Sequence, residues 1–152
     1  MSGLYCRFLF PWLLEFGLGG EDAGKERAKA LESAYGEVLE VGFGTALNLA
    51  HYPRGVSRLI AIEPEAMLPQ KVSQRIAAAA FPVEIIRHSG DRLPLEDRRF
   101  DCVVTTWTLC TIDDPVSALR EMRRVLKPGG NYLFYEHGRS AESESGPVAR
   151  LG

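Results

Sequence analysis

The stretch Val38-Leu-Glu-Val-Gly-Phe-Gly-Thr-Ala46 decides the fold of this chain. It joins a short apolar run to two glycines spaced by one residue, and a helical pattern, Thr45–His51, follows. Glycines at such a place let the chain turn tightly and let a ligand lie against bare backbone, and the N-terminus of the next helix offers unpaired N–H groups to an anion. A tight turn without a ligand is the alternative, because a lone G-x-G is a weak motif.

Short apolar, β-branched runs recur along the chain after this turn. Several of these runs consist almost entirely of hydrophobic residues, which is typical of strands buried on both faces. Helical patterns lie between them: Glu65–Ala80, in which Pro69 restarts the helix, and Pro115–Leu126, with Asp114 as N-cap. The alternation predicts βαβ units and a three-layer α/β sandwich around a five-stranded, mainly parallel sheet. The expected strands are Glu37–Val41, Arg58–Glu63, Val83–His88, Asp101–Thr106 and Asn131–Glu136.

The two ends of the chain differ from its middle. Two helices are expected first, Pro11–Leu18, which stops at Gly19-Gly20, and Asp22–Tyr35, which Gly36 closes. Residues 139–152 are polar and lack a core-forming pattern. We therefore expect an N-terminal helical lid (1–35), a ligand-binding domain (36–138) and a polar tail (139–152).

Composition excludes several classes of protein. The chain has 152 residues, with 20 acidic and 18 basic side chains and a net charge of −2, which argues against nucleic-acid binding by phosphate neutralisation. No run approaches the roughly 20 apolar residues of a transmembrane helix. Cys6, Cys102 and Cys110 form no C-x-x-C pair, so we expect no metal site, no disulfide framework and a cytoplasmic location.

An acidic residue ends the second expected strand. Glu63 follows Gly44 by about 20 residues, a spacing that places a carboxylate on the ribose hydroxyls of a bound nucleoside. A solvated acid at a strand end is the alternative. Leu47 stands where a dinucleotide fingerprint requires Gly or Ala, which disfavours an NAD(P)-dependent oxidoreductase, and the Lys-Ser/Thr of a P-loop is absent.

Five sequence motifs occur in order between residues 36 and 137. They are Glu40–Ala46, Ile62–Pro64 with Met67, Gly90–Pro94, Phe100–Val104 and Arg124–Gly130. Together they resemble the motifs of the class I S-adenosylmethionine-dependent methyltransferases of type 11. The resemblance implies a Rossmann-like fold with S-adenosylmethionine as cofactor. The short segments G-F-G-T, N-L, H-Y-P, T-L-C-T and E-H-G are similar to those of small-thiol S-methyltransferases and lipid-headgroup N-methyltransferases.

The resemblance implies a role for each matching position. Where the family has a third glycine, this chain has Ala46, which would crowd the cofactor if its φ were positive. Two of the positions have a structural alternative: Asp91 could be a turn residue, and Trp107 could be an ordinary residue of the hydrophobic core. The implied contacts are Glu40, Gly42 and Gly44 with the methionine end, Glu63 with the ribose, Pro64 and Met67 with the ribose–adenine face, Asp91 with the adenine amine, Arg92 beside the ring, and Thr106 and Trp107 beside the sulfonium.

Methyl transfer is an in-line displacement that positioning can accelerate, so no dedicated base is required. The methyl acceptor is expected to be a small molecule: a thiol, an amine or a lipid-like compound. A cofactor-binding module without turnover is the non-enzymatic alternative, and the N-terminal helix could contact a membrane surface instead of forming a lid. Candidates near the acceptor are Tyr5, Trp107, Cys110, Glu136 and His137, although His137 could be a polar strand-end residue and Cys110 a structural thiol.

Relative to the family, the chain offers only a polar tail after the fifth strand, where a further helix and a two-strand hairpin are usual. The fifth strand is then expected to be an exposed edge. This predicts a homodimer through that edge, or a reduced activity.

Overall fold

The computed structural model describes residues 15–17, 19–65 and 67–136 of the chain. Residues 15–17 are helical. The helices are α2 (Glu21–Leu31), α3 (Pro69–Ala77), α4 (Pro115–Val125) and the short 3-10 helices η1 (Leu47–His51) and η2 (Leu109–Thr111). The strands are β1 (Gly36–Val41), β2 (Val56–Ile62), β3 (Val83–Ile86), β4 (Phe100–Thr106) and β5 (Leu126–Tyr135).

The five strands form one sheet in the order β3-β2-β1-β4-β5, and every pairing is parallel. β1 lies at the centre, with β2 on one side and β4 on the other. The chain therefore reverses its winding direction at β1, which is where open α/β sheets bind ligands at the carboxyl ends of the strands. The predicted α/β class and five-stranded sheet are confirmed.

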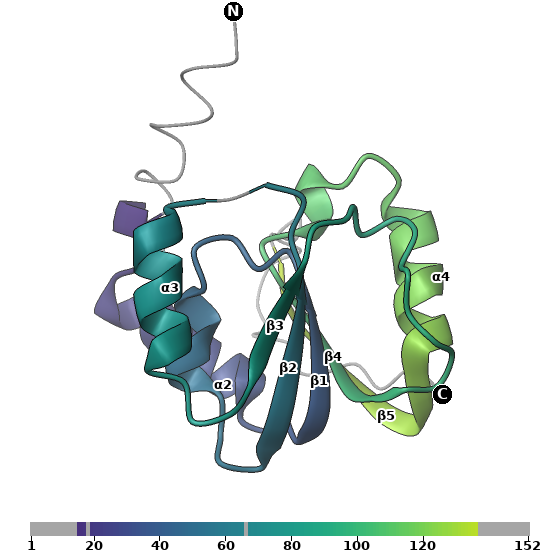
Figure 1. Cartoon of the computed structure of the whole chain (residues 1–152), viewed down its shortest axis with the longest axis horizontal. Coiled ribbons are helices and arrows are strands. Elements are labelled where there is room, and N and C mark those ends of the chain that lie inside the picture. The colour runs from purple at the N-terminus through teal and green to yellow at the C-terminus, as the bar shows by residue number, and fades with distance from the viewer. Residues whose placement is uncertain (1–14, 18, 66, 137–152) are drawn as a thin grey trace, which may run out of the picture.

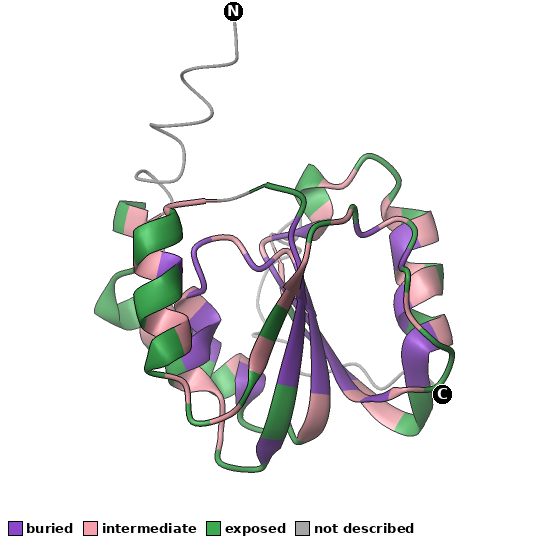
Figure 2. Ribbon diagram, in the orientation of Figure 1, coloured by how far each residue is buried: buried purple, intermediate pink, exposed green. Residues whose placement is uncertain are grey.

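Helices cover both faces of the sheet (Figure 1). Adjacent residues of β1 point to opposite faces, so Val38 joins the core under α2 and α3, whereas Leu39 joins the core under α4. Both residues are fully buried. The central strands are buried along most of their length (Figure 2), which explains their nearly continuous hydrophobic sequence.

The connection between α4 and β5 differs from the prediction. Leu126 follows the last helical residue and already pairs with Phe100, so the strand begins before the expected Asn131. The ladder then passes from Phe100↔Leu126 to Cys102↔Asn131. The residues in between, 127–130, form an irregularity in a strand instead of a turn before it, and Gly129 has a φ of +77° there.

Several helix boundaries were also wrong. α2 ends at Leu31 instead of Tyr35, and Gly36 begins β1 instead of capping the helix. Residues 47–51 form a 3-10 helix, and α3 begins only at Pro69, as a helix restarted by proline would. The cap of α4 is confirmed, because Asp114 Oδ1 accepts a hydrogen bond from Ser117 N at 3.0 Å.

The predictions for the chain ends are tested only in part. Most of Pro11–Leu18 and all of residues 139–152 lie outside the described residues. Within the described ranges, β5 pairs with β4 alone, and a second copy at this edge stays a prediction. No helix among the described residues is long and apolar enough to cross a membrane.

Candidate functional site

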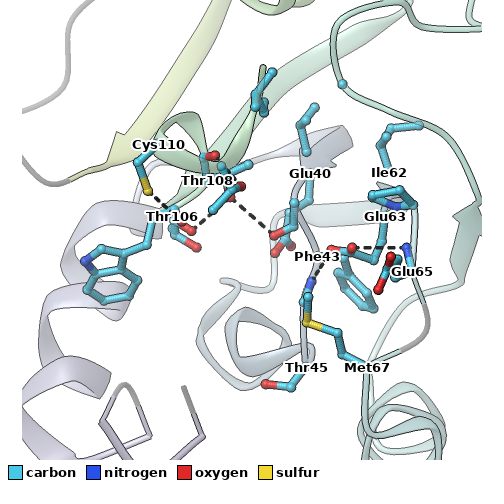
Figure 3. Close-up of a pocket in the computed structure, with 18 of the residues that line it drawn as sticks. Glu40, Phe43, Thr45, Ile62, Glu63, Glu65, Met67, Thr106, Thr108 and Cys110 are labelled. Atoms are coloured by element: carbon cyan, nitrogen blue, oxygen red, sulfur yellow. Dashed lines mark hydrogen bonds between the residues drawn. The ribbon is translucent and has the colours of Figure 1, made fainter. Parts of the chain in front are cut away.

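A cavity of about 830 Å³ opens at the carboxyl ends of β1, β2 and β4. It extends from Glu63 at one end to Cys110 at the other (Figure 3). Figure 3 shows the labelled side chains that project into it from these strand ends and the loops after them. Its position at the reversal of the strand order is the one that the fold favours for a ligand.

The two glycines of the loop after β1 share a positive φ but differ in their surroundings. Gly42 has a φ of +82°, and a Cβ there would overlap the side chain of Thr108, so the loop after β4 requires this glycine. Gly44 has a φ of +54° and has nothing within 4 Å of where a Cβ would lie. Since Gly44 lines the cavity, the space beside its backbone is open to a ligand.

Glu63 is held by backbone amides at the end of β2. Its Oε2 accepts a hydrogen bond from Gly44 N at 2.7 Å, and its Oε1 accepts one from Glu65 N at 3.4 Å (Figure 3). Burial raises the pKa of this carboxyl, and the Gly44 amide opposes that rise. The carboxylate thus faces the cavity in a fixed orientation, and its free lone pairs can accept hydrogen bonds from hydroxyl groups of a ligand.

The remaining residues expected at the adenine end lie in different places. Pro64, Met67 and Asp91 line the cavity, and Ser89 Oγ donates a hydrogen bond to Asp91. Arg92 is exposed and is not part of the lining. Pro64 and Met67 give this part of the wall an apolar surface, and Asp91 gives it a carboxylate acceptor, a combination that an adenine ring can use.

Ala46 does adopt a positive φ, of +64°. It does not crowd the cavity, however, because it is buried in the core under α2 and α3 and does not line the cavity. Its methyl group therefore does not face the cavity, and its effect on cofactor binding stays a prediction. An L-residue in this conformation carries a modest strain that the surrounding packing offsets.

Glu40, at the end of β1, is held by side chains. It is 1% exposed, its Oε1 accepts a hydrogen bond from Asn48 Nδ2 at 2.8 Å, and its Oε2 accepts one from Tyr52 Oη at 2.7 Å. Burial raises the pKa of the Glu40 carboxyl to about 7, while the two hydrogen bonds lower it. Sequence reasoning noted the N-L and H-Y-P motifs without a role, and the structure gives one to Asn48 and Tyr52.

Arg27 on α2 is a cavity residue that sequence reasoning missed. It is 4% exposed, and its Nη1 donates to Asn48 Oδ1 at 2.7 Å. Its Cζ lies 4.5 Å from the centre of the Trp107 ring, within the range of a cation–π interaction. The sequence spacing could have identified it: positions 27, 31 and 34 share one face of the expected helix, so Arg27 places a cation on the face that carries Leu31 and Ala34.

The loop after β4 forms the other end of the cavity. Trp107 has a φ of +49°, its backbone N donates to Tyr135 O at 2.8 Å, and its ring meets Tyr135 edge to face at 4.6 Å. Cys110 is exposed and lines the cavity, with its Sγ 3.8 Å from Trp107 O. Thr106 also lines the cavity, and its Oγ1 accepts from Asn48 Nδ2 at 3.0 Å.

Glu136, directly after β5, fixes this loop. Its carboxylate accepts hydrogen bonds from Thr108 N at 2.9 and 3.1 Å and from Leu109 N at 3.2 Å. These amides begin η2, so Glu136 acts as a distant cap for that turn. It positions the loop and is not itself part of the cavity lining.

The N-terminal segment closes one side of the site. Glu15 pairs with Arg75 and with Lys71 of α3, and Arg75 Nη1 also donates to Thr45 O in the glycine loop at 2.6 Å. The hydrogen bond with Arg75 lowers the pKa of Glu15 to about 2. Gly17 lines the cavity, and the lid expected of residues 1–35 stays a prediction; Tyr5 and His137 lie outside the described residues.

The charge of the cavity wall is mainly negative. Five carboxyl groups and one guanidinium, that of Arg27, line it among the described residues; the carboxyl groups belong to Glu40, Glu63, Glu65, Asp91 and Asp113. No group of three potential metal-ligating side chains occurs in the part of the chain that the structure describes. The site therefore suits an organic cation or zwitterion.

Comparison with known proteins decides the family. Residues 39–134 match a family described as a methyltransferase domain. The chain belongs to the class I S-adenosylmethionine-dependent methyltransferases. It is similar to human thiol S-methyltransferase TMT1B, at 30% identity over 87% of this chain and 59% of the relative. It therefore spans about three-fifths of that protein.

Two further methyltransferases are similar to this chain over most of its length. The phosphatidylethanolamine N-methyltransferase of Cereibacter sphaeroides is 28% identical over 90% of this chain and 66% of its own. A Thermotoga maritima structure, described as an S-adenosylmethionine-dependent methyltransferase and possible histamine N-methyltransferase, has a TM-score of 0.65 and 26% identity over 88% of this chain and 60% of that one. The fold and its cofactor class are thus shared with enzymes of different acceptors.

The cavity residues fit the cofactor of the methyltransferase family. The Glu63 carboxylate offers acceptors for two neighbouring hydroxyls, and the open space beside Gly44 leaves room against the backbone. The buried charges of Arg27 and Glu40 at the other end suit an amino-acid group, which carries one charge of each sign. The wall is otherwise apolar near Met67 and Ile62, as an adenine ring requires.

Proposed function

We propose that this chain binds S-adenosylmethionine and transfers its methyl group to the sulfur of a small thiol. The fixed carboxylate of Glu63, which faces the same cavity as Trp107 and Cys110, carries the proposal. Membership of the methyltransferase family and the similarity to human thiol S-methyltransferase TMT1B support it.

The residues of this chain bind and orient; the cofactor supplies an activated methyl group on a sulfonium. Glu63 would hold the ribose, and Asp91 would accept from the adenine amine. Gly44 leaves its backbone accessible. Glu136 and Tyr135 fix the loop that carries Trp107, so the indole would form a rigid wall beside the reacting atoms. Such positioning can supply most of the acceleration of a displacement reaction.

A thiol suits the acceptor end better than an amine. Trp107, Cys110, Thr111 and Ile112 line this end, and no histidine lies among the described lining residues. A thiol, with a pKa of about 8.5, ionises near neutral pH more readily than an alkylamine loses its proton, so it needs no strong base.

The first test measures binding by calorimetry with S-adenosylhomocysteine and with NADH. We expect micromolar affinity for S-adenosylhomocysteine and none for NADH. The second test incubates the chain with methyl-labelled S-adenosylmethionine and 2-mercaptoethanol, ethanolamine or vesicles containing phosphatidylethanolamine, and measures labelled product by mass spectrometry.

The acceptor series separates the alternatives. Label on 2-mercaptoethanol alone supports the thiol proposal. Label on ethanolamine or on the lipid replaces it with an amine acceptor. Tight binding without label on any acceptor indicates a binding module without turnover, and loss of S-adenosylhomocysteine binding overturns the proposed function.

A further inference from the structure

One motif of the sequence has no part in the cavity wall, although its first residue contacts a loop that does. The motif is Arg124–Gly130, and Arg124 lies in the last turn of α4. The loop joins β3 to β4 and carries Asp91, which lines the cavity. The contact between them therefore links α4 to the wall of the site.

Arg124 and Glu121 of α4 form a bidentate ion pair. Arg124 Nε donates to Glu121 Oε1 at 2.8 Å, and Arg124 Nη2 donates to Glu121 Oε2 at 2.8 Å. The hydrogen bond with Arg124 lowers the pKa of Glu121 to about 2, so this carboxyl group is ionised near neutral pH. Two parallel hydrogen bonds fix the relative orientation of the two side chains, which a single contact does not.

The ion pair holds both backbone groups of Leu93. Glu121 Oε2 accepts a hydrogen bond from Leu93 N at 2.8 Å, and Arg124 Nη2 donates one to Leu93 O at 3.0 Å. Arg124 Nη1 also donates to Leu95 O at 2.8 Å and to Asp97 Oδ1 at 2.6 Å. Side chains of α4 thus satisfy backbone groups of the loop that lie outside any helix or strand.

Asp91 lies between two fixed points of this loop. On one side, a Cβ at Gly90 would come within 2.7 Å of Val41 Cγ1, so the Gly90 backbone packs closely against β1. On the other side, Leu93 is 4% exposed and belongs to the core under α4. Ser89 Oγ donates a hydrogen bond to the Asp91 carboxylate itself. The position of Asp91 in the cavity therefore depends on α4 as well as on its own neighbours.

We propose that Glu121 and Arg124 are positioning residues that, by holding Leu93, keep the Asp91 carboxylate where it accepts a hydrogen bond from the purine amino group of the cofactor. The inference rests on the proposed function and deepens it, because it assigns part of the choice of nucleobase to a helix outside the cavity. Neither Glu121 nor Arg124 lines the cavity, so their effect on a ligand must pass through the loop. A displaced acceptor loses much of its hydrogen bond, because the strength of the bond falls steeply with poor geometry.

The test uses two ligands that differ only in the purine amino group. S-adenosylhomocysteine carries it, whereas in the 6-deamino analogue a hydrogen atom replaces it. Calorimetry on the full chain measures both affinities for the unmodified protein, for E121Q and R124K, and for the controls E84Q and R58K. The controls change another ion pair in the same way, because Arg58 Nη2 lies 2.7 Å from Glu84 Oε2 on β2 and β3, outside the cavity lining.

For the unmodified chain we expect S-adenosylhomocysteine to bind about tenfold more tightly than the deamino analogue. Glutamine at position 121 has one acceptor oxygen and no charge, and lysine at position 124 keeps the charge but not the planar fork. E121Q and R124K should each weaken S-adenosylhomocysteine about fivefold and the deamino analogue by no more than about twofold. E84Q and R58K should keep the ratio of the unmodified chain.

A double variant shows whether Glu121 acts through Asp91. D91A removes the acceptor, so the two ligands should bind with affinities within about twofold of each other. Adding E121Q to D91A should then change neither affinity by more than about twofold, because the group that Glu121 positions is already absent. A further loss of S-adenosylhomocysteine affinity in the double variant would contradict the proposed route.

Other outcomes overturn the inference in different ways. If E121Q and R124K weaken both ligands by the same factor, the ion pair has only a general structural role. If E121Q does not fold, R124K replaces it in both experiments, and an unchanged ratio there overturns the positioning role. Equal affinities for the two ligands in the unmodified chain overturn the inference alone, whereas no binding of either ligand overturns the proposed function with it.

Discussion

The two ends of the cavity each contain a glutamate at the carboxyl end of a central strand, and the chain holds them by different means. Glu63, after β2, receives backbone amides from Gly44 and Glu65. Glu40, at the end of β1, receives the side chains of Asn48 and Tyr52. The strands are neighbours and the residue type is the same, and burial raises the pKa of both carboxyls, that of Glu40 to about 7.

This difference separates two ways of building a site. A carboxylate held by amides of adjacent loops depends on the local path of the chain. The Glu40 carboxylate is held by Asn48 of η1 and by Tyr52, and Asn48 also bonds to Arg27 of α2, so its arrangement depends on how distant elements pack. We therefore expect changes around Glu63 to affect ligand binding alone, and changes around Glu40 to affect binding, pH response and stability together.

The largest effect is expected from E63Q. Glutamine offers one acceptor oxygen instead of two and no charge, so two charge-assisted hydrogen bonds to the ribose are weakened. S-adenosylhomocysteine affinity should fall about 100-fold by calorimetry, with little change in melting temperature. E84Q, on the exposed face of β3, is the control with the same chemical change. If the affinity of E63Q for S-adenosylhomocysteine stays within threefold of that of the unmodified chain, Glu63 does not bind the ligand as expected.

The glycine loop lies between the two ends and offers a matched pair. G42A combines a positive φ with overlap on Thr108, so the free energy of unfolding should fall by about 3 kcal/mol. G44A has a positive φ but open space, so we expect a loss of about 1 kcal/mol. Urea titration measures both. G44A should fold but bind S-adenosylhomocysteine more weakly than the unmodified chain. Equal losses of unfolding free energy in G42A and G44A would contradict the expected difference between the two glycines.

The pH response should belong to the Glu40 end. An ammonium group needs the ionised carboxylate, so S-adenosylhomocysteine affinity should rise about tenfold between pH 6 and pH 8. Stability should change in the opposite direction: the raised pKa favours folding below about 4.5, and this contribution is lost as the pH rises to about 7. E40Q should flatten both profiles, and a pH profile unchanged in E40Q would exclude Glu40 as its source.

The smallest effect is expected from E136Q, at the loop that carries Trp107. Glutamine keeps one oxygen for the amides of Thr108 and Leu109, so the loop should loosen without unfolding. We expect kcat/KM for the thiol to fall about threefold, and S-adenosylhomocysteine affinity to stay within twofold. Calorimetry and initial rates measure the two. Equal losses in binding and rate would mean that Glu136 supports the whole cavity.

The sequence predicted the side of the cavity around Glu63 better than the side around Glu40. Gly44, Glu63 and Asp91 lie in loops that directly follow strands, and parallel strands bring such loops together without further information. Arg27, Asn48 and Glu136 meet their partners only after helices and strands pack, and neither composition nor spacing specifies those contacts. The same reason explains the error at residues 127–130, where a typical turn sequence lies within a strand because Leu126 already pairs with β4.

The excess of carboxyl groups over Arg27 in the cavity wall bears on turnover. Methyl transfer converts a sulfonium to a neutral thioether, so the spent cofactor carries one positive charge fewer than the fresh one. A negative wall attracts the fresh form more strongly and retains the spent form less, especially at low ionic strength. Under the proposed function, such a wall would therefore favour exchange of the spent cofactor for a fresh one more than a neutral pocket of the same shape would.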